Sequence, residues 1–255
     1  MTQSMNIKPK QRGLLVIQQL VAYLCFPLLY FLVVLWMKYI QKYRIRDMKQ
    51  IRRRFKNIKA QNPNGLLICP NHLTYIDSLL LVWAFSSLGS YLLTFKTVCW
   101  NLPNARNVQE SLLYRVICYL GKCILIDEDP EKAKQTMSKA AYLLDHGHYV
   151  MIFPEGRRST SGRVDTENHI YGVGKLHTDS HLKQVLCVYM RGEQQQTASK
   201  MPDRGDTFNI KMQLQTIDTN QQGRRAMRTA ANTIINTLSH MEADYFAADK
   251  ADAGQ

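Results

Sequence analysis

The sequence has few of the patterns that mark metal sites, disulfides or serine hydrolases. Its six cysteines include no Cys-x-x-Cys pair, and each lies in an apolar neighbourhood. We therefore expect free buried thiols in a reducing compartment. His177 and His181 are spaced four apart without a clear third ligand, so we predict no metal site. A Gly-x-Ser-x-Gly motif, typical of serine lipases and thioesterases, is also missing.

Acidic residues are scarce at the N-terminal end. Residues 1–60 contain one, Asp47, against 13 basic residues, a net charge of +12, whereas residues 61–255 contain 20 basic and 19 acidic residues, a net of +1. A total charge of +13 suggests a nucleic-acid or anionic-membrane partner. Because the larger part of the chain is nearly neutral, it has no electrostatic footprint for nucleic acid, and we predict no nucleic-acid partner.

Charge is absent from Leu14 to Met37, a run of 24 residues that is almost wholly apolar. At about 1.5 Å per residue, this run could cross a hydrocarbon core of about 30 Å. No small-residue cleavage site follows it, which argues against a signal peptide. Three basic residues precede the run and ten follow it, so a spanning helix would leave the remainder of the chain in the cytoplasm. Pro27 near its middle would also permit a re-entrant, monotopic anchor.

Short apolar runs bounded by turn residues predict strands that are buried on both faces. These runs are Gly65–Pro70, Tyr91–Lys96, Cys123–Asp127, Tyr149–Pro154 and Val185–Met190. Between the third and fourth run, Asp129 and Pro130 are suited to begin a helix that Gly147 stops. This alternation predicts an α/β fold with a central, mostly parallel sheet flanked by helices, and an N-terminal hydrophobic anchor helix.

The C-terminal part of the chain predicts an edge strand and a covering helix. Phe208–Thr216 alternates apolar and polar residues, as in a strand with one exposed face. Met227, Ala231, Ile234, Leu238 and Met241 form one stripe of a helix that covers the sheet. We divide the chain into an N-terminal anchor with a basic segment (1–60), an α/β domain (61–246) and a flexible tail (247–255).

The first predicted strand leads into Asn71-His72, and Asp77 follows five residues after the histidine. A histidine at the end of a buried strand can act as a general base when a carboxylate orients it. A structural alternative remains open, because Thr74 followed three residues later by Asp77 resembles a capping box. The fourth predicted strand leads into Phe153-Pro154-Glu155-Gly156-Arg157-Arg158-Ser159, where arginine forks suit phosphate oxygens.

Together these two blocks resemble the glycerolipid acyltransferase family, which includes lysophosphatidate and glycerol-3-phosphate acyltransferases. The family signature is Asn-His, four residues and Asp, followed some eighty residues later by Phe-Pro-Glu-Gly-x-Arg-Ser. Both blocks occur here in the family's order and at its usual separation.

The resemblance implies transfer of a fatty acyl group from acyl carrier protein or coenzyme A to a hydroxyl of a lysophospholipid, above all 1-acyl-glycerol-3-phosphate. His72 would be the general base and Asp77 would orient it. The acceptor would be bound by Asn71, Glu155, Gly156, Arg157, Arg158 and Ser159. The partners would then be the lipid bilayer, the lyso-lipid and the acyl thioester, without a cofactor. We expect a cytoplasmic (inner) membrane location, with the catalytic domain facing the cytoplasm.

One further family block departs from its pattern. Members have Gly-x-x-Phe-x-x-Arg, but this chain has Asp127 where the family places an arginine that helps to hold the acceptor's phosphate. Either the acceptor is a different lyso-lipid or specialised alcohol, or Lys122 and Arg158 compensate. Three other hypotheses stay open: a thioesterase that uses water, a nucleophilic role for Cys69, and a non-enzymatic binder of anionic membranes or nucleic acid through residues 38–59.

Overall fold

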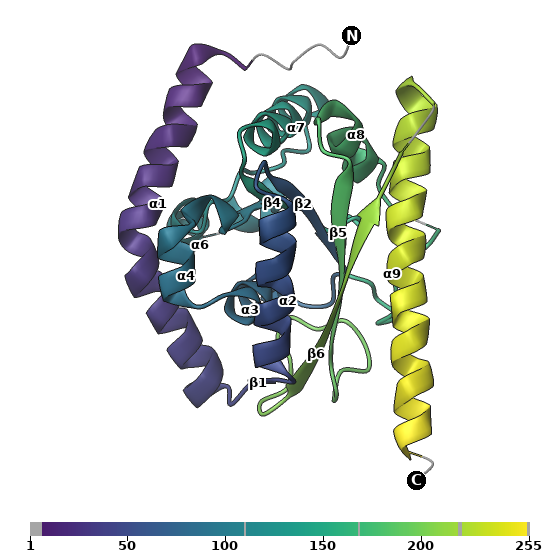
Figure 1. Cartoon of the computed structure of the whole chain (residues 1–255). Helices are drawn as coiled ribbons and strands as arrows, with labels where there is room; N and C mark the ends of the chain where they lie inside the picture. The colour runs from purple at the N-terminus through teal and green to yellow at the C-terminus, as the bar shows by residue number, and fades with distance from the viewer. Residues whose placement is uncertain (1–6, 110, 168, 219–220, 254–255) are drawn as a thin grey trace.

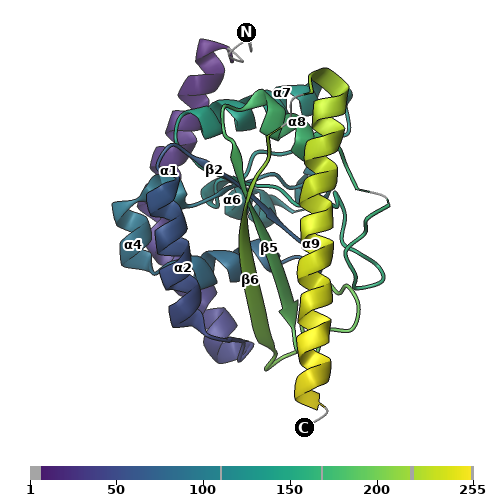
Figure 2. The same cartoon turned by 45° about the vertical axis from the view of Figure 1, so that its right-hand side comes forward.

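The structure, a computed structural model, describes residues 7–109, 111–167, 169–218 and 221–253. The chain forms a six-stranded sheet. Figure 1 shows helices on both of its faces, and Figure 2 shows it from the side of the C-terminal helix. The strands lie in the order β1-β6-β5-β2-β4-β3. Their bounds are β1 Arg44–Ile45, β2 Leu66–Pro70, β3 Trp100–Asn101, β4 Tyr149–Met151, β5 Gln184–Gly192 and β6 Thr207–Thr216.

The helices include one long helix at each end of the chain and shorter ones between them (Figure 1). Their bounds are α1 Pro9–Leu35, α2 Met48–Gln61, α3 Asp77–Phe85, α4 Leu88–Leu93, α5 Ala105–Gln109, α6 Leu112–Leu120, α7 Pro130–Asp145, α8 Gly172–Asp179 and α9 Gly223–Ala253. A π-helical turn, Trp36–Ile40, extends α1, and a 3₁₀ turn, Phe95–Thr97, follows α4.

The predicted fold class is confirmed. β2 pairs in parallel with β4 and β5, and β3 pairs in parallel with β4. β6 is antiparallel to β5 and alternates buried with exposed side chains, as its sequence predicts. Only its first two residues pair with the short β1, so most of its outer edge is free of strand pairing within the described chain.

Two of the predicted strands are wrong. Tyr91–Lys96 forms the end of α4 and the following 3₁₀ turn, and Leu93 is 88% exposed. Ser87 caps α4, and a six-residue apolar run does not by itself distinguish a helix from a strand. Cys123–Asp127 forms no strand and makes only isolated bridges, from Cys123 to Asn101 at the end of β3 and from Ile126 to Asn104.

Each face of the sheet supports its own hydrophobic core. On β2, Leu67 and Cys69 face the cluster formed with α7, α8 and α9, whereas Leu66 and Ile68 face the cluster formed with α2 and α3. Burial on both faces explains why β2 has an unbroken apolar sequence. The sheet is therefore a rigid layer from which the loops after β2 and β4 project.

The expected helix signals are found at α7, and α9 is longer than expected. Asp129 accepts hydrogen bonds from the backbone N–H groups of Glu131 and Lys132, and Pro130 is the first helical residue. Gly147 has a φ of +81°, the left-handed conformation expected after a helix. α9 continues to Ala253, through most of the segment 247–255 that we expected to be a flexible tail.

The N-terminal helix lies along the side of the body (Figure 1, purple). α1 is continuous through Pro27 and, with its π-helical turn, is long and apolar enough to cross a membrane. Its buried residues are Leu15, Gln18, Ala22 and Phe26. Gln18 donates hydrogen bonds to the carbonyls of Tyr119 and Cys123, which fixes the helix beside α6.

Close packing of α8 on α9 generates a prediction about stability. A Cβ atom on Gly174 would lie 1.9 Å from the carbonyl oxygen of Met227, whereas one on Gly89 in α4 would meet nothing within 4 Å. Gly174→Ala should therefore destabilise the protein by about 1–3 kcal/mol or more, because two helix backbones must separate.

Gly89→Ala is the matched control and should stabilise the protein by roughly 0.5–1 kcal/mol. Urea unfolding in detergent would measure both changes. Equal unfolding midpoints for the two variants would contradict the packing explanation.

Candidate functional site

The loops that follow β2 and β4 meet at one edge of the sheet. The two strands are parallel neighbours, so their carboxyl ends lie side by side. The first loop carries Asn71, His72 and Asp77, and the second carries residues 153–159. The two blocks that the sequence places more than seventy residues apart are thus brought together by one strand pairing.

His72 and Asp77 form a hydrogen-bonded pair. His72 Nδ1 lies 2.9 Å from Asp77 Oδ2. The Asp77 side chain is 2% exposed and the His72 side chain is 21% exposed, so the carboxylate lies behind the ring. With Nδ1 held by Asp77, Nε2 is the ring nitrogen left for a substrate.

Asp77 also organises the loop that carries His72. Its Oδ2 accepts hydrogen bonds from the backbone N–H groups of Leu73, at 2.7 Å, and Thr74, at 2.9 Å, and its Oδ1 accepts one from the Thr74 hydroxyl. Asp77 is the first residue of α3, and Ile76 is the N-cap. Thr74 is therefore not the N-cap that the capping-box interpretation requires, but Asp77 still closes a turn with Thr74 and also contacts the histidine.

The second loop supports His72 from the opposite side. The Phe153 ring stacks on the His72 ring with centroids 4.0 Å apart. Glu155, which is 2% exposed, accepts hydrogen bonds from the His72 backbone N–H at 2.8 Å and from the Asp165 N–H at 3.3 Å. Ser159 donates its backbone N–H to the His72 carbonyl at 3.1 Å. Glu155 and Ser159 thus hold the histidine loop through its backbone.

Asn71 joins the histidine loop to the sheet. Its side chain donates to the carbonyl of Met190, at 3.0 Å, and accepts from the N–H of the same residue, at 2.7 Å. Both atoms are buried within the described structure, so this amide replaces a pair of strand hydrogen bonds beyond the end of β2. These two bonds attach the residue before His72 to β5.

A cavity of about 490 Å³ opens in front of His72. Of the predicted acceptor residues, Gly156, Arg157 and Arg158 line it, whereas Asn71, Glu155 and Ser159 lie among the buried residues behind it. The lining also includes apolar residues from α1, α3 and α6, among them Leu29, Val33, Leu79, Tyr114, Ile117 and Cys118. The cavity is therefore basic at one end and mainly apolar along the rest.

The two arginines of the cavity are held differently. Arg157 is paired with Asp165 at 3.0 Å. The Arg158 guanidinium lies 3.7 Å from the centre of the Tyr75 ring and has no ion pair among the residues that the structure describes. Arg158 is thus oriented by an aromatic face while its hydrogen-bond donors stay available to an anion.

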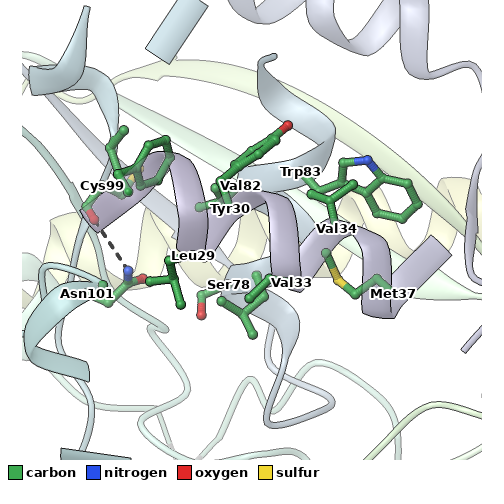
Figure 3. Close-up of a pocket in the computed structure, with 14 residues that line it drawn as sticks. Leu29, Tyr30, Val33, Val34, Met37, Ser78, Val82, Trp83, Cys99 and Asn101 are labelled. Carbon is green, nitrogen blue, oxygen red and sulfur yellow. Dashed lines mark hydrogen bonds between the residues drawn. The ribbon is translucent and has the colours of Figure 1, made fainter. Parts of the chain in front are cut away.

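A second cavity, of about 60 Å³, lies behind the first, between α1 and α3 (Figure 3). The two cavities share lining residues, including Leu29, Val33 and Leu79. Its far wall is formed by large side chains, including Tyr30, Met37 and Trp83. Together the cavities follow α1 away from His72 along an apolar path.

The segment Gly121–Asp127, which departs from the family pattern, ends beside the larger cavity that contains His72. Asp127 is not part of the lining and is paired with Lys132 at the start of α7. Lys122 is only 1% exposed and donates hydrogen bonds to the carbonyls of Phe95 and Val98. Lys122 therefore cannot supply the positive charge that the family's arginine would provide. Of the two basic residues that we considered as replacements, only Arg158 remains.

Cys69 is a poor candidate for a nucleophile. It is fully buried in β2, and burial raises the pKa of its thiol well above the usual range. It is also absent from the cavity lining. Four of the six cysteines, 69, 99, 118 and 187, are buried as predicted, whereas Cys25 and Cys123 are partly exposed.

Sequence reasoning missed Tyr75, Phe153 and α6 as parts of the site. Tyr75 and Phe153 lie within or beside the quoted motifs, but their ring contacts depend on the meeting of two distant loops. The only signal for α6 in the sequence is its apolar composition, which does not indicate a position beside His72.

Comparisons with known proteins agree with the motifs. Residues 50–219 match the family described as acyltransferase. Among solved structures, the chain is similar to the 1-acyl-sn-glycerophosphate acyltransferase PlsC from Thermotoga maritima, with 14% identity and a TM-score of 0.45. That match covers 89% of this chain and 96% of the other, and such low similarity says nothing about the acceptor. No curated protein matches the chain significantly.

The buried Glu155 generates a prediction about pH. Burial raises its pKa to about 7, despite the two N–H donors that lower it. Because the folded value lies above the unfolded value, the folded protein binds this proton more tightly, and stability falls as the pH rises towards 7. Between about pH 5 and about pH 8, wild-type protein should lose roughly 2–3 kcal/mol more stability than Glu155→Gln.

Denaturant unfolding at a series of pH values would measure this difference. Glu167→Gln is the control, because Glu167 is an exposed carboxyl on the segment that follows Asp165. Parallel stability curves for wild type and Glu155→Gln would show that the carboxyl does not titrate as we expect.

Proposed function

Because the chain belongs to the acyltransferase family, we propose that it transfers a fatty acyl group from an acyl thioester to a hydroxyl of a lysophospholipid. The acceptor that we favour is 1-acyl-glycerol-3-phosphate. One observation carries this proposal: the His72–Asp77 pair opens onto a cavity that is basic at one end and apolar along the rest. Such a cavity suits a molecule with a phosphate, a hydroxyl and an acyl chain.

In this mechanism His72 Nε2 takes the proton of the acceptor hydroxyl as its oxygen attacks the thioester carbonyl carbon. Asp77 keeps the ring in the required tautomer and stabilises the imidazolium. The tetrahedral intermediate then collapses, the carbon–sulfur bond breaks, and the imidazolium returns its proton to the departing sulfur. The products are an ester and a free thiol, and the sequence of steps needs neither a metal nor a covalent acyl-enzyme.

The acceptor's phosphate would bind near Arg158 and Arg157. Arg158 has the better position, since its guanidinium is oriented by Tyr75 and is not neutralised by a carboxylate in the described structure. Gly156 has a φ of +68° and lines the cavity, so its backbone can approach the ligand without a side chain in the way.

The acyl chains would occupy the apolar part of the cavity along α1 and α3. This lining keeps water away from the reacting thioester, which favours transfer over hydrolysis. Acyl carrier protein and coenzyme A are both suitable donors, because the proposal requires only a thioester. Attachment of the chain to the cytoplasmic membrane through α1, with the catalytic domain facing the cytoplasm, would supply the lyso-lipid directly.

A second candidate is an acyltransferase for a lyso-lipid or alcohol without a phosphomonoester. It is favoured by Asp127, which stands where the family has a phosphate-binding arginine. A panel of acceptors that differ only in the headgroup separates the two candidates. A thioesterase would release free fatty acid at the same rate with or without an acceptor.

Removal of the proposed base should abolish most of the activity. His72→Ala should lower kcat by about 10²–10⁴-fold, because the general base contributes this much to comparable reactions. Release of free thiol from acyl-coenzyme A or acyl carrier protein, in the presence of lyso-lipid, would measure the rate. His240→Ala, on the exposed face of α9, is the matched control. Full activity in His72→Ala would rule out this mechanism.

Arg158 should determine the affinity for a phosphorylated acceptor. Arg158→Ala should raise KM for 1-acyl-glycerol-3-phosphate roughly 10- to 100-fold, since a charge-assisted hydrogen bond contributes about 1.5–3 kcal/mol. The KM for the acyl thioester should change little. Arg225→Ala, an exposed arginine on α9, is the control. An unchanged acceptor KM in Arg158→Ala would favour the candidate without a phosphomonoester.

A further inference from the structure

The outward face of α1 is apolar over most of its length. The exposed large side chains on this helix are Leu14, Val16, Ile17, Leu20, Tyr23, Leu24, Leu28, Phe31, Leu32 and Leu35. Basic residues lie before and after this stretch, Lys8 and Lys10 at its start and Lys38 at its end. An apolar face between basic ends is complementary to the hydrocarbon and anionic headgroups of one leaflet.

The opposite face of α1 is docked on the body from one end to the other. Leu15 belongs to the core that includes α7 and α9, Gln18 bonds to the end of α6, and Tyr30 donates to the carbonyl of Ser86 after α3. If α1 stood perpendicular to a bilayer, the body beside it would also have to enter the hydrocarbon, at a high cost for its charged surface. The membrane plane must therefore run parallel to the axis of α1.

A second apolar surface lies next to α1 on α6. Leu112 is 73% exposed and Leu113 is 69% exposed, and Val116, one turn later, is also exposed. In Figure 1, α6 lies directly beside α1, and the Gln18 hydrogen bond to Tyr119 joins the two helices. The exposed leucines thus continue the apolar surface of α1 onto the body.

The same short helix forms part of the cavity wall. Tyr114, Ile117 and Cys118 of α6 line the cavity that contains His72, and Ile117 is also exposed at the surface. One side of α6 therefore faces the reacting groups and another side faces the surroundings. The position of α6 relative to the membrane decides how a lipid reaches His72.

We propose that α6 is a second membrane-inserting element: Leu112, Leu113 and Val116 enter the same leaflet as the outer face of α1. This inference rests on the proposed function, because the position of the cavity mouth relative to the bilayer matters only if the substrate is a lipid. The occupant of this surface is lipid rather than protein, since the surface is continuous with that of α1 and Arg115 on α6 adds positive charge. Insertion would bring the cavity mouth to the lipid, so that the lyso-lipid enters without crossing water.

Fluorescence quenching tests the insertion without any need for enzymatic activity. Leu113→Trp in the full chain, bound to vesicles of phosphatidylcholine and phosphatidylglycerol, should show added fluorescence that acyl-brominated lipids quench. Asn236→Trp is the matched control, because Asn236 is exposed on α9, on the side of the molecule away from α1 (Figure 2). Its added fluorescence should not be quenched.

Absence of quenching at residue 113 would overturn the proposal, and a blue-shifted emission in that case would indicate that a second protein copy covers α6. Equal quenching at residues 113 and 236 would also overturn it, because the proposal places α6 in the membrane and α9 outside it.

Activity provides a second test. Leu112→Gln combined with Leu113→Gln should lower kcat/KM for lyso-lipid embedded in vesicles by about tenfold, since two inserted leucines lose their contact with hydrocarbon. The rate with a short-chain lyso-lipid dissolved as monomers should not change. Asn236→Gln combined with His240→Gln on α9 is the control. An equal loss with both substrates, or no loss with either, contradicts membrane insertion.

The two tests also separate this inference from the proposed function. A parent protein that is inactive with every acceptor would refute the proposed function, while quenching at residue 113 would still decide the position of α6.

Discussion

The Asp77 carboxylate is the contact on which the arrangement of the site depends. It accepts two backbone N–H groups and a hydroxyl from the loop that precedes it, and it also holds His72 Nδ1. These bonds close the turn between β2 and α3, so the same group that begins the helix orients the histidine. A substitution at Asp77 would therefore disturb the loop as well as the ring. One carboxylate therefore both closes the turn and contacts the histidine ring.

The pairing of β2 with β4 brings the second loop to this turn. Glu155 and Ser159 contact the backbone of His72, and Phe153 contacts its ring. The motif that resembles an acceptor-binding block thus divides into two parts. Its buried residues hold the backbone of the His72 loop in place, and its arginines line the cavity. This division explains how a loop of seven residues can contribute both to positioning and to recognition.

Much of this structure could be predicted from local patterns, and some of it could not. β2, β4 and β5 could be predicted because burial on both faces gives them apolar sequences. The start of α7 could be predicted because Asp129 is a typical N-cap residue and Pro130 a typical first residue of a helix. β1 and β3 are two residues long, too short for any periodicity to register. Tyr91–Lys96 could not be assigned correctly from its pattern, because a short apolar run does not distinguish a helix from a strand, and Ser87 begins a helix there. Likewise, the stacking of Tyr75 and Arg158 depends on loops that meet only in the folded chain.

The lengthwise docking of α1 has a consequence for biogenesis. α1 precedes α4 in the chain, so the surfaces that receive Ala22 and Phe26, in α4 and the turn after it, are synthesised later than α1. The nascent helix can therefore associate with lipid before its protein partners exist. If lipid holds α1, as the proposed anchoring requires, the body would complete its fold against a helix that is already in place. A chain without α1 would leave Tyr91 and Phe95 uncovered.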